Sequence, residues 1–85
     1  MTIKDAAGSK LHSKIVRFFH ENQGSIDTPR GVATWIAEER EAVKKALEDL
    51  VDLKILLAHR STSTTGYSYT RDAKLIRRIA KLLDA

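Results

Sequence analysis

The chain has 85 residues, a hydrophobic fraction of 42% and no cysteine. This length suits one small domain, and no uninterrupted apolar run approaches the roughly 20 residues that a membrane-spanning helix needs. The N-terminus carries no apolar signal core, and a chain without cysteine has neither disulfides nor thiolate metal ligands. We therefore expect a cytoplasmic protein that does not interact with membranes.

Charge is spread unevenly along the chain. The formal net charge is +4, but residues 38–52 hold three Lys/Arg against six Asp/Glu, whereas residues 53–85 hold seven against two. The positive field is therefore expected around the C-terminal third, and the middle segment is locally acidic.

The first third of the chain predicts a tail, a helix and a short strand. Residues 1–8 show no repeating apolar pattern, and we expect them to form a flexible N-terminal tail. Ser9 can cap a first helix that runs to about Asn22, with Gly24 ending it. The inward positions of this helix are Leu11, Ile15, Phe18 and Phe19. Residues 25–27 are short and extended, which suits one strand of a small sheet.

Two closely spaced helices follow. Thr28 and Pro29 form a strong helix start, because the hydroxyl caps the helix and proline suits the first turn. This helix ends near Ala37, and the next begins at a cap by Glu39 and runs to about Leu53. Their inward faces are predicted to be Val32, Ala33 and Ile36 on the first helix and Val43, Leu47, Leu50 and Val51 on the second. Two helices joined this closely must cross steeply to share one core, which is the helix-turn-helix arrangement.

A hairpin is predicted after the two helices. Residues 55–60 form a β-type run, and a second run returns after a hydroxyl-rich turn, in which Gly66 can take the positive φ that such turns require. Tyr67 and Tyr69 share one face of the returning strand. Helix, turn, helix and hairpin in this order predict a winged helix-turn-helix, mainly α with a small antiparallel sheet, formed by residues 9–70.

Residues 71–85 predict a C-terminal amphipathic helix, which Thr70 can cap. One side of the helix is basic, with Lys74, Arg77, Arg78 and Lys81. The stripe of Leu75, Ile79 and Leu82 on the other side either packs on the domain or forms an interface with a second copy of the chain or another partner.

The apolar pattern resembles the winged helix-turn-helix domains of bacterial transcription regulators. Their Leu-Ala pair, later apolar residue, turn, recognition helix and apolar strand correspond here to Val32-Ala33, Ile36, Val43, Leu47, Leu50 and Ile55-Leu56. The chain departs from them at three positions. Ala37 and Lys54 stand where such domains commonly have glycine, and Glu39 stands where they commonly have a capping Ser or Thr. The resemblance covers about residues 9–70.

The resemblance implies double-stranded DNA as the partner, with the second helix of the motif near the major groove. The matching positions on that helix are Glu39, Arg40, Glu41, Lys44 and Lys45, of which two are acidic. Turn hydroxyls can donate to phosphate as well. We therefore predict DNA contacts by Arg30, Arg40, Lys44, Lys45, Arg60, Ser61, Thr62, Ser63 and Thr64. The structural alternatives are a solvated helix face and an ordinary polar hairpin tip.

Two other functional classes compete with DNA binding. One is a winged-helix module that binds a protein partner through its acidic helix, with Trp35 as a rim residue or an anchor for that partner. The other is an enzyme, which the sequence does not support. His12, His20 and His59 are not at metal-ligand spacing, and the glycines form no phosphate-binding loop. We expect no catalytic residue, metal or cofactor.

Overall fold

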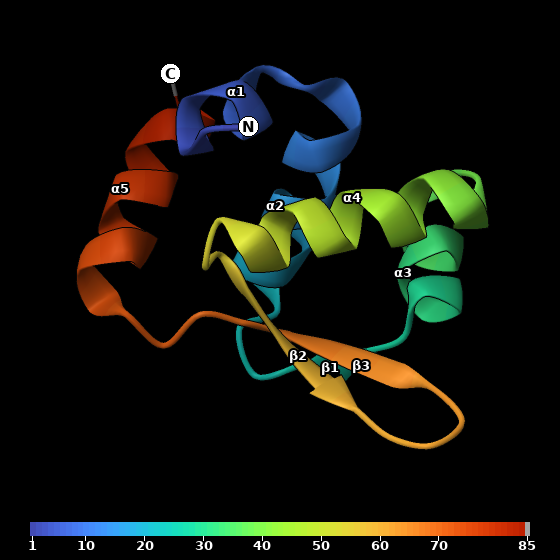
Figure 1. The fold of residues 1–85 in the computed structure, drawn as a ribbon. Helices are drawn as coiled ribbons and strands as arrows, with labels where there is room; N and C mark the ends of the chain where they lie inside the picture. The colour runs from blue at the N-terminus through green and yellow to red at the C-terminus, as the bar shows by residue number, and fades with distance from the viewer. Residues whose placement is uncertain (85) are drawn as a thin grey trace.

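The computed structural model describes residues 1–84, which fold into five helices and one three-stranded antiparallel sheet (Figure 1). The helices are α1 (Ile3–Gly8), α2 (Lys10–Glu21), α3 (Pro29–Ile36), α4 (Arg40–Asp52) and α5 (Ala73–Asp84). The strands are β1 (Ile26–Asp27), β2 (Leu56–Arg60) and β3 (Thr65–Tyr69). The chain therefore has the predicted winged helix-turn-helix fold.

The helix-turn-helix pair begins and turns where the sequence predicts. The Thr28 hydroxyl accepts a hydrogen bond from the Gly31 N–H at 3.2 Å, and Pro29 occupies the first position of α3. The Glu39 carboxylate accepts from the N–H groups of Glu41 and Ala42, at 2.6 and 3.1 Å, at the start of α4. Both predicted caps are confirmed, and they satisfy N–H groups that have no partner inside their helices.

Ala37 and Lys54, which stand where such domains commonly have glycine, both adopt the left-handed backbone conformation. Ala37 has φ 56° and ψ 49° between α3 and α4, and Lys54 has φ 68° just after α4. These conformations are costly for residues with a Cβ, so the surrounding packing must hold them. The prediction that Gly66 supplies a positive φ is wrong, because no glycine in the described residues has one. A Cβ on Gly66 would lie 2.9 Å from the Ile26 Cγ2, so a larger residue there would require the Ile26 side chain to shift.

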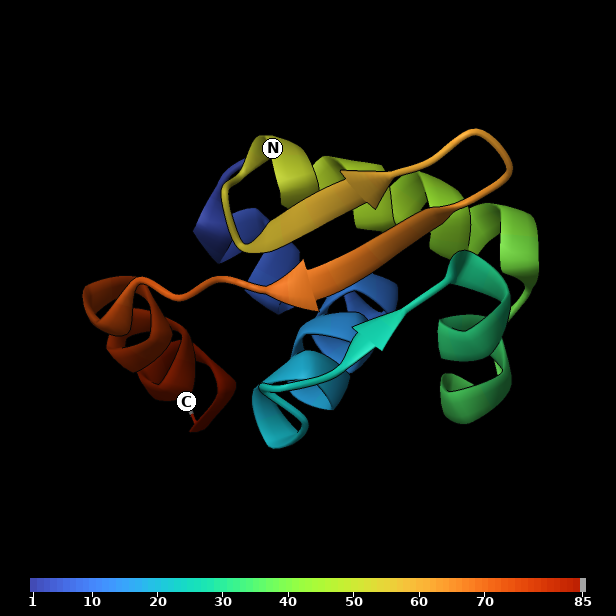
Figure 2. The ribbon, with the colours of Figure 1, turned by 90° about the horizontal axis from the view of Figure 1, so that it is seen from below.

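The sheet lies against the helices with β3 in the centre, in the order β1-β3-β2 (Figure 2). Ile26 pairs with Ser68, which confirms the predicted third strand, and Leu56 pairs with Tyr69. Tyr67 and Tyr69 share one face of β3, as predicted, and both are buried there. They complete one core with α2 and α4, whose buried members include Ile15, Phe19, Val43, Leu47 and Leu50. Ile36 packs at the edge of this core.

The expectation of a flexible tail over residues 1–8 is wrong in its structure, because these residues form α1. Thr2 and Asp5 make a capping box: each side chain accepts a hydrogen bond from the other residue's N–H, at 3.1 and 3.0 Å. Two donors at the helix start are thereby satisfied. Ala6 is buried in the core, so α1 covers part of the domain.

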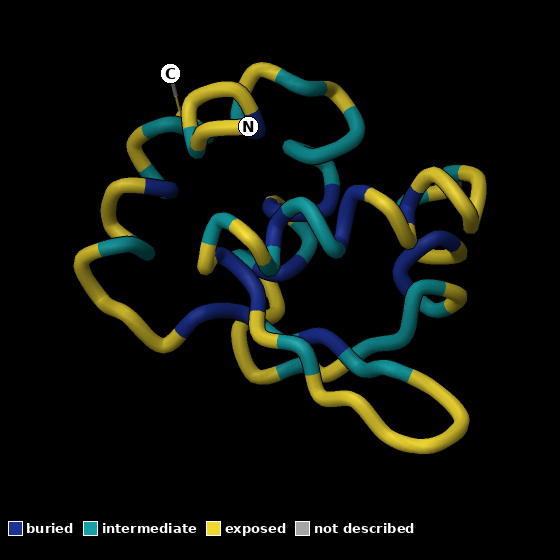
Figure 3. Tube along the Cα trace, viewed as in Figure 1, coloured by how far each residue is buried: buried dark blue, intermediate teal, exposed yellow. Residues whose placement is uncertain are grey.

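Helix α5 packs on α1 and α2. Its cap is Asp72 rather than the predicted Thr70, because the Asp72 carboxylate accepts from the N–H groups of Lys74 and Leu75. Of the predicted interface stripe, Ile79 is only 2% exposed, whereas Leu75 and Leu82 are half-buried. Along α5, exposed stretches alternate with buried or intermediate ones (Figure 3). Part of the stripe is therefore used inside the chain. Among the described residues, no helix combines the length and apolar character that crossing a bilayer requires.

Candidate nucleic-acid interface

A groove opens between the start of α3, the outer face of α4 and the β2–β3 hairpin, which is the wing of this fold. We call it the α4–wing groove, and its lining residues are Thr28, Pro29, Arg30, Arg40, Glu41, Lys44, Glu48, Arg60, Ser61, Thr62, Ser63, Thr64, Thr65 and Tyr67. The segments meet here because the steep crossing of α3 and α4 and the β2–β3 pairing bring them to one side of the domain (Figure 2). Hydroxyls and cations dominate the lining.

Most of the predicted DNA contacts line this groove. They are Arg30, Arg40, Lys44, Arg60, Ser61, Thr62, Ser63 and Thr64. Lys45 does not line it; its Nζ lies 3.9 Å from the Asp49 Oδ2 one helical turn away. The fold thus gathers residues that are up to 34 positions apart in the sequence, from Arg30 to Thr64. Contact with DNA itself stays a prediction.

The cations of the groove differ in their surroundings. Within the described residues, Arg30, Arg40 and Lys44 form no ion pair. Arg60 is paired with Glu48 of α4: its Nη1 lies 3.1 Å from Oε2, and its Nη2 lies 2.9 Å from Oε1. This bidentate arrangement matches the planar fork of the guanidinium to the carboxylate. Arg60 is therefore neutralised, which the prediction of a simple phosphate contact did not include.

Tyr67 completes the Glu48 site. Its hydroxyl donates a hydrogen bond to Glu48 Oε2 from the buried inner face of β3. The hydrogen bond from Arg60, followed by that from Tyr67, holds the pKa of Glu48 below its usual value of 4.5. Burial, followed by the hydrogen bond to Glu48, raises the pKa of Tyr67 to about 12. Glu48 is therefore a carboxylate at neutral pH with three hydrogen bonds.

The other residues of the groove are less constrained. The Ser61 hydroxyl donates to the Thr64 carbonyl at 2.8 Å and so is used within the hairpin turn. Thr62 and Ser63 are exposed at its tip. Glu39 is engaged with the helix start, whereas Glu41 lines the groove without a cationic partner in the described residues. Four cations and two carboxylates, Glu41 and Glu48, leave the lining with a net charge of +2.

A polar cluster that the sequence did not predict joins α2 to α4. His12 Nδ1 lies 2.7 Å from the Ser9 hydroxyl, and His12 Nε2 lies 2.9 Å from Asp49 Oδ2. These are the residue types of a hydrolytic triad, but the Ser9 hydroxyl caps α2 and none of the three lines either surface hollow described here. The cluster fastens two core helices to each other. No group of three or more metal-ligating side chains occurs in residues 1–84.

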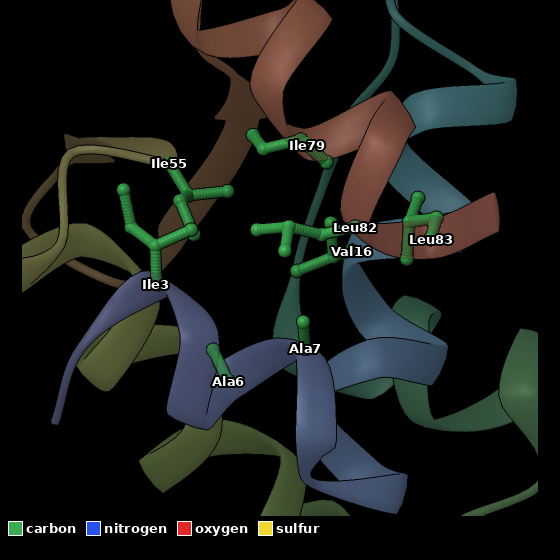
Figure 4. A pocket seen from close by; sticks show the side chains of 8 residues that line it. All are labelled: Ile3, Ala6, Ala7, Val16, Ile55, Ile79, Leu82 and Leu83. Atoms are coloured by element: carbon green, nitrogen blue, oxygen red, sulfur yellow. The ribbon is translucent and has the colours of Figure 1, made fainter. Parts of the chain in front are cut away.

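The second hollow lies between α1 and α5 and is wholly apolar (Figure 4). Its lining residues are Ile3, Ala6, Ala7, Val16, Ile55, Ile79, Leu82 and Leu83. Ligand sites usually combine apolar walls with a few polar groups that orient the ligand, and this space has none. We interpret it as the junction at which the stripe of α5 meets α1.

Comparisons with known proteins identify the fold but not a family. No protein-family model and no curated protein matches the chain. A solved structure of a mutant of ZitR from Lactococcus lactis is similar, with a TM-score of 0.62 and 21% sequence identity. The two chains share a fold. The match covers 85% of this chain but only 52% of the ZitR chain, so this chain spans about half the length of that neighbour. At this identity, the likeness carries no statement about function.

Proposed function

We propose that this domain binds double-stranded DNA through the α4–wing groove and regulates transcription in the bacterial cytoplasm. The observation that supports this most is the gathering of three cations without acidic partners, Arg30, Arg40 and Lys44, beside the hydroxyl-rich hairpin. Phosphate binding requires such cations and donors, and a winged helix presents them on a surface that a duplex can approach.

The groove suggests how docking would proceed. Arg40 and Lys44 lie on one face of α4, one helical turn apart, and Arg30 at the start of α3 extends the same positive surface. The hairpin tip would lie along the neighbouring backbone, where the hydroxyls of Thr62 and Ser63 could donate to phosphates. Most of these contacts would position the duplex, and sequence discrimination would require α4 to reach base edges.

A salt titration with random-sequence duplex DNA tests this function. If three cations neutralise phosphates, the slope of log affinity against log salt should be about −2.7, so affinity should fall about 40-fold between about 50 and 200 mM salt. Four cations including Arg60 would give a slope of about −3.6. The absence of duplex binding at low salt would rule out the proposed function.

A second function is supported by a different observation. Trp35 is 72% exposed on α3, and its ring stacks on Phe18 with the ring centroids 6.4 Å apart. Trp35 thus covers Phe18 as a rim residue, yet most of its own surface stays in water, as is common for aromatic anchors of protein interfaces. If duplex binding is absent, this aromatic surface makes a protein-interaction module the better proposal.

A further inference from the structure

We propose that Glu48 is a specificity-determining residue of the α4–wing groove: it occupies Arg60 and so lowers the affinity of the groove for DNA of any sequence. This inference rests on the proposed function. Glu48 touches no nucleic acid in this proposal. It acts by pairing with Arg60, so that Arg60 is not free to bind a phosphate and the groove makes fewer sequence-independent contacts with DNA.

The geometry shows why Arg60 is withheld. Both terminal nitrogens of its guanidinium donate hydrogen bonds to the two oxygens of Glu48, at 2.9 and 3.1 Å. Both nitrogens are therefore already engaged before any phosphate approaches. Glu48 is itself held by the hydrogen bond from Tyr67, whose ring is buried in the core. The carboxylate therefore has a defined position on the wall of the groove rather than a freely rotating one.

The charges show what the pair costs in binding. A phosphate contact strengthens DNA binding because the cation displaces condensed counterions, and a neutral ion pair displaces fewer. The side chains of Arg60 and Glu48 remain 57% and 40% exposed, so a duplex in the groove would lie near an ion pair that carries no net charge. Among the described residues, Arg30, Arg40 and Lys44 form no ion pair, although Lys44 lies close enough to Glu48 to help lower the pKa of that carboxylate.

The Glu48–Arg60 ion pair adds little to the stability of the fold. The hairpin is already held by the β2–β3 pairing from Leu56 with Tyr69 to Arg60 with Thr65, and by the two buried tyrosines. Exposed ion pairs add little to stability in general. Glu48 also accepts the hydrogen bond from the buried Tyr67, which a neutral glutamine could accept as well. The charge of Glu48 is therefore what reduces sequence-independent binding, and this increases the share of affinity that must come from contacts with bases.

The test is a salt titration of Glu48→Gln with random-sequence duplex DNA. Glutamine keeps an acceptor for Tyr67 but removes the charge that neutralises Arg60. We expect the slope to steepen from about −2.7 to about −3.6, and the affinity at about 0.1 M salt to rise roughly 8-fold. Adding Arg60→Ala to Glu48→Gln should return the slope and the affinity to about the wild-type values, because the two changes together leave the net charge of the groove unchanged.

Glu41→Gln is the matched control, because it removes a carboxylate from the same groove without releasing an arginine. Its effect should not depend on Arg60. If wild type binds and Glu48→Gln leaves the slope unchanged, the inference is wrong while the proposed function stands. If neither protein binds, both are wrong. Binding by Glu48→Gln alone would support the inference and show that wild type needs more than bare DNA.

A second measurement does not depend on DNA. In a Tyr69→Phe background, the absorbance of the remaining tyrosine reports the ionisation of Tyr67, whose pKa of about 12 should fall when Glu48 becomes glutamine. An unchanged pKa would overturn the inference, because it would show that Glu48 does not contact Tyr67 in solution. If Glu48→Gln fails to fold, Glu48→Ala replaces it in the salt titration, and an unchanged slope in that variant would overturn the inference.

Discussion

The α4–wing groove and helix α5 lie at opposite ends of the molecule and carry positive charge in different ways (Figures 1 and 2). In the groove, Arg60 is neutralised by Glu48, and Glu41 lies among the remaining cations. On α5, the exposed side carries four cations that form no ion pair with the described residues: Lys74, Arg77, Arg78 and Lys81. Among the described residues, α5 therefore has four cations without an ion pair, against three in the groove.

The groove is nevertheless better suited to DNA binding than α5, because of its shape and its hydrogen-bond donors. The groove is concave and adds hairpin hydroxyls from Thr62 and Ser63 to its cations. Helix α5 presents its cations on an outer surface without such a set of hydroxyls, and its inner side is used to pack on α1 and α2. We therefore place the duplex in the groove, and the comparison teaches that a count of charges does not locate an interface. The following experiments can break or sharpen this contrast.

The largest expected effect concerns the core that both ends share. Leu47 of α4 and Ile79 of α5 belong to one buried cluster. Leu47→Ala and Ile79→Ala should each reduce the free energy of unfolding by about 2–5 kcal/mol, because each leaves a cavity in a small domain. Denaturant unfolding measures this. Wild-type stability in Ile79→Ala would show that α5 is not part of the core, and in Leu47→Ala it would contradict the fold.

Charge reversals separate the two ends directly. Lys44→Glu should weaken duplex binding by at least about 8-fold at about 0.1 M salt, since it removes one phosphate contact and adds repulsion. Arg78→Glu on α5 should change the affinity less than about 2-fold, because only the long-range field is altered. Fluorescence of Trp35, the one tryptophan of the chain, offers a readout for the titration. A larger effect of Arg78→Glu would move the interface to α5.

The pH dependence of stability tests the Glu48–Arg60 pair without DNA. The pKa of Glu48 is lowered in the folded state, so the pair stabilises the fold above the usual value of 4.5, and this contribution is lost as the pH falls through the lowered pKa. The difference in Tm between wild type and Glu48→Gln should therefore be small, largest near neutral pH, and should shrink at acidic pH. A difference that grows on acidification would contradict the pair.

The smallest effect is expected in self-association. Ile79 is buried within its own chain, and Leu75 and Leu82 keep only part of their surface exposed. We expect a monomer in sedimentation experiments at about 0.1 mM protein, because the central residue of the stripe is already buried within its own chain. A dimer that Leu75→Lys converts to a monomer would instead place the stripe at a two-fold interface.

Local sequence patterns predicted most of the fold. Thr28 and Pro29 mark a helix start through their own chemistry, and the spacing of Val43, Leu47 and Leu50 specifies which face of α4 turns inward. The capping box of Thr2 and Asp5 is an equally local pattern, so α1 was predictable although we expected a tail. Asp72, two residues beyond the expected cap, was likewise visible in the sequence.

The sequence by itself determined the elements, their order and the winged-helix arrangement, because hydrogen bonds and side-chain periodicity within a helix or hairpin involve near neighbours. Only the tertiary structure decided which charges meet. Glu48 reaches Arg60 across 12 residues and His12 reaches Asp49 across 37, through the packing of α4 on the hairpin and on α2. Such pairs depend on distances between elements. The sequence therefore predicted which cations could contact DNA, but not which of them are paired with a carboxylate.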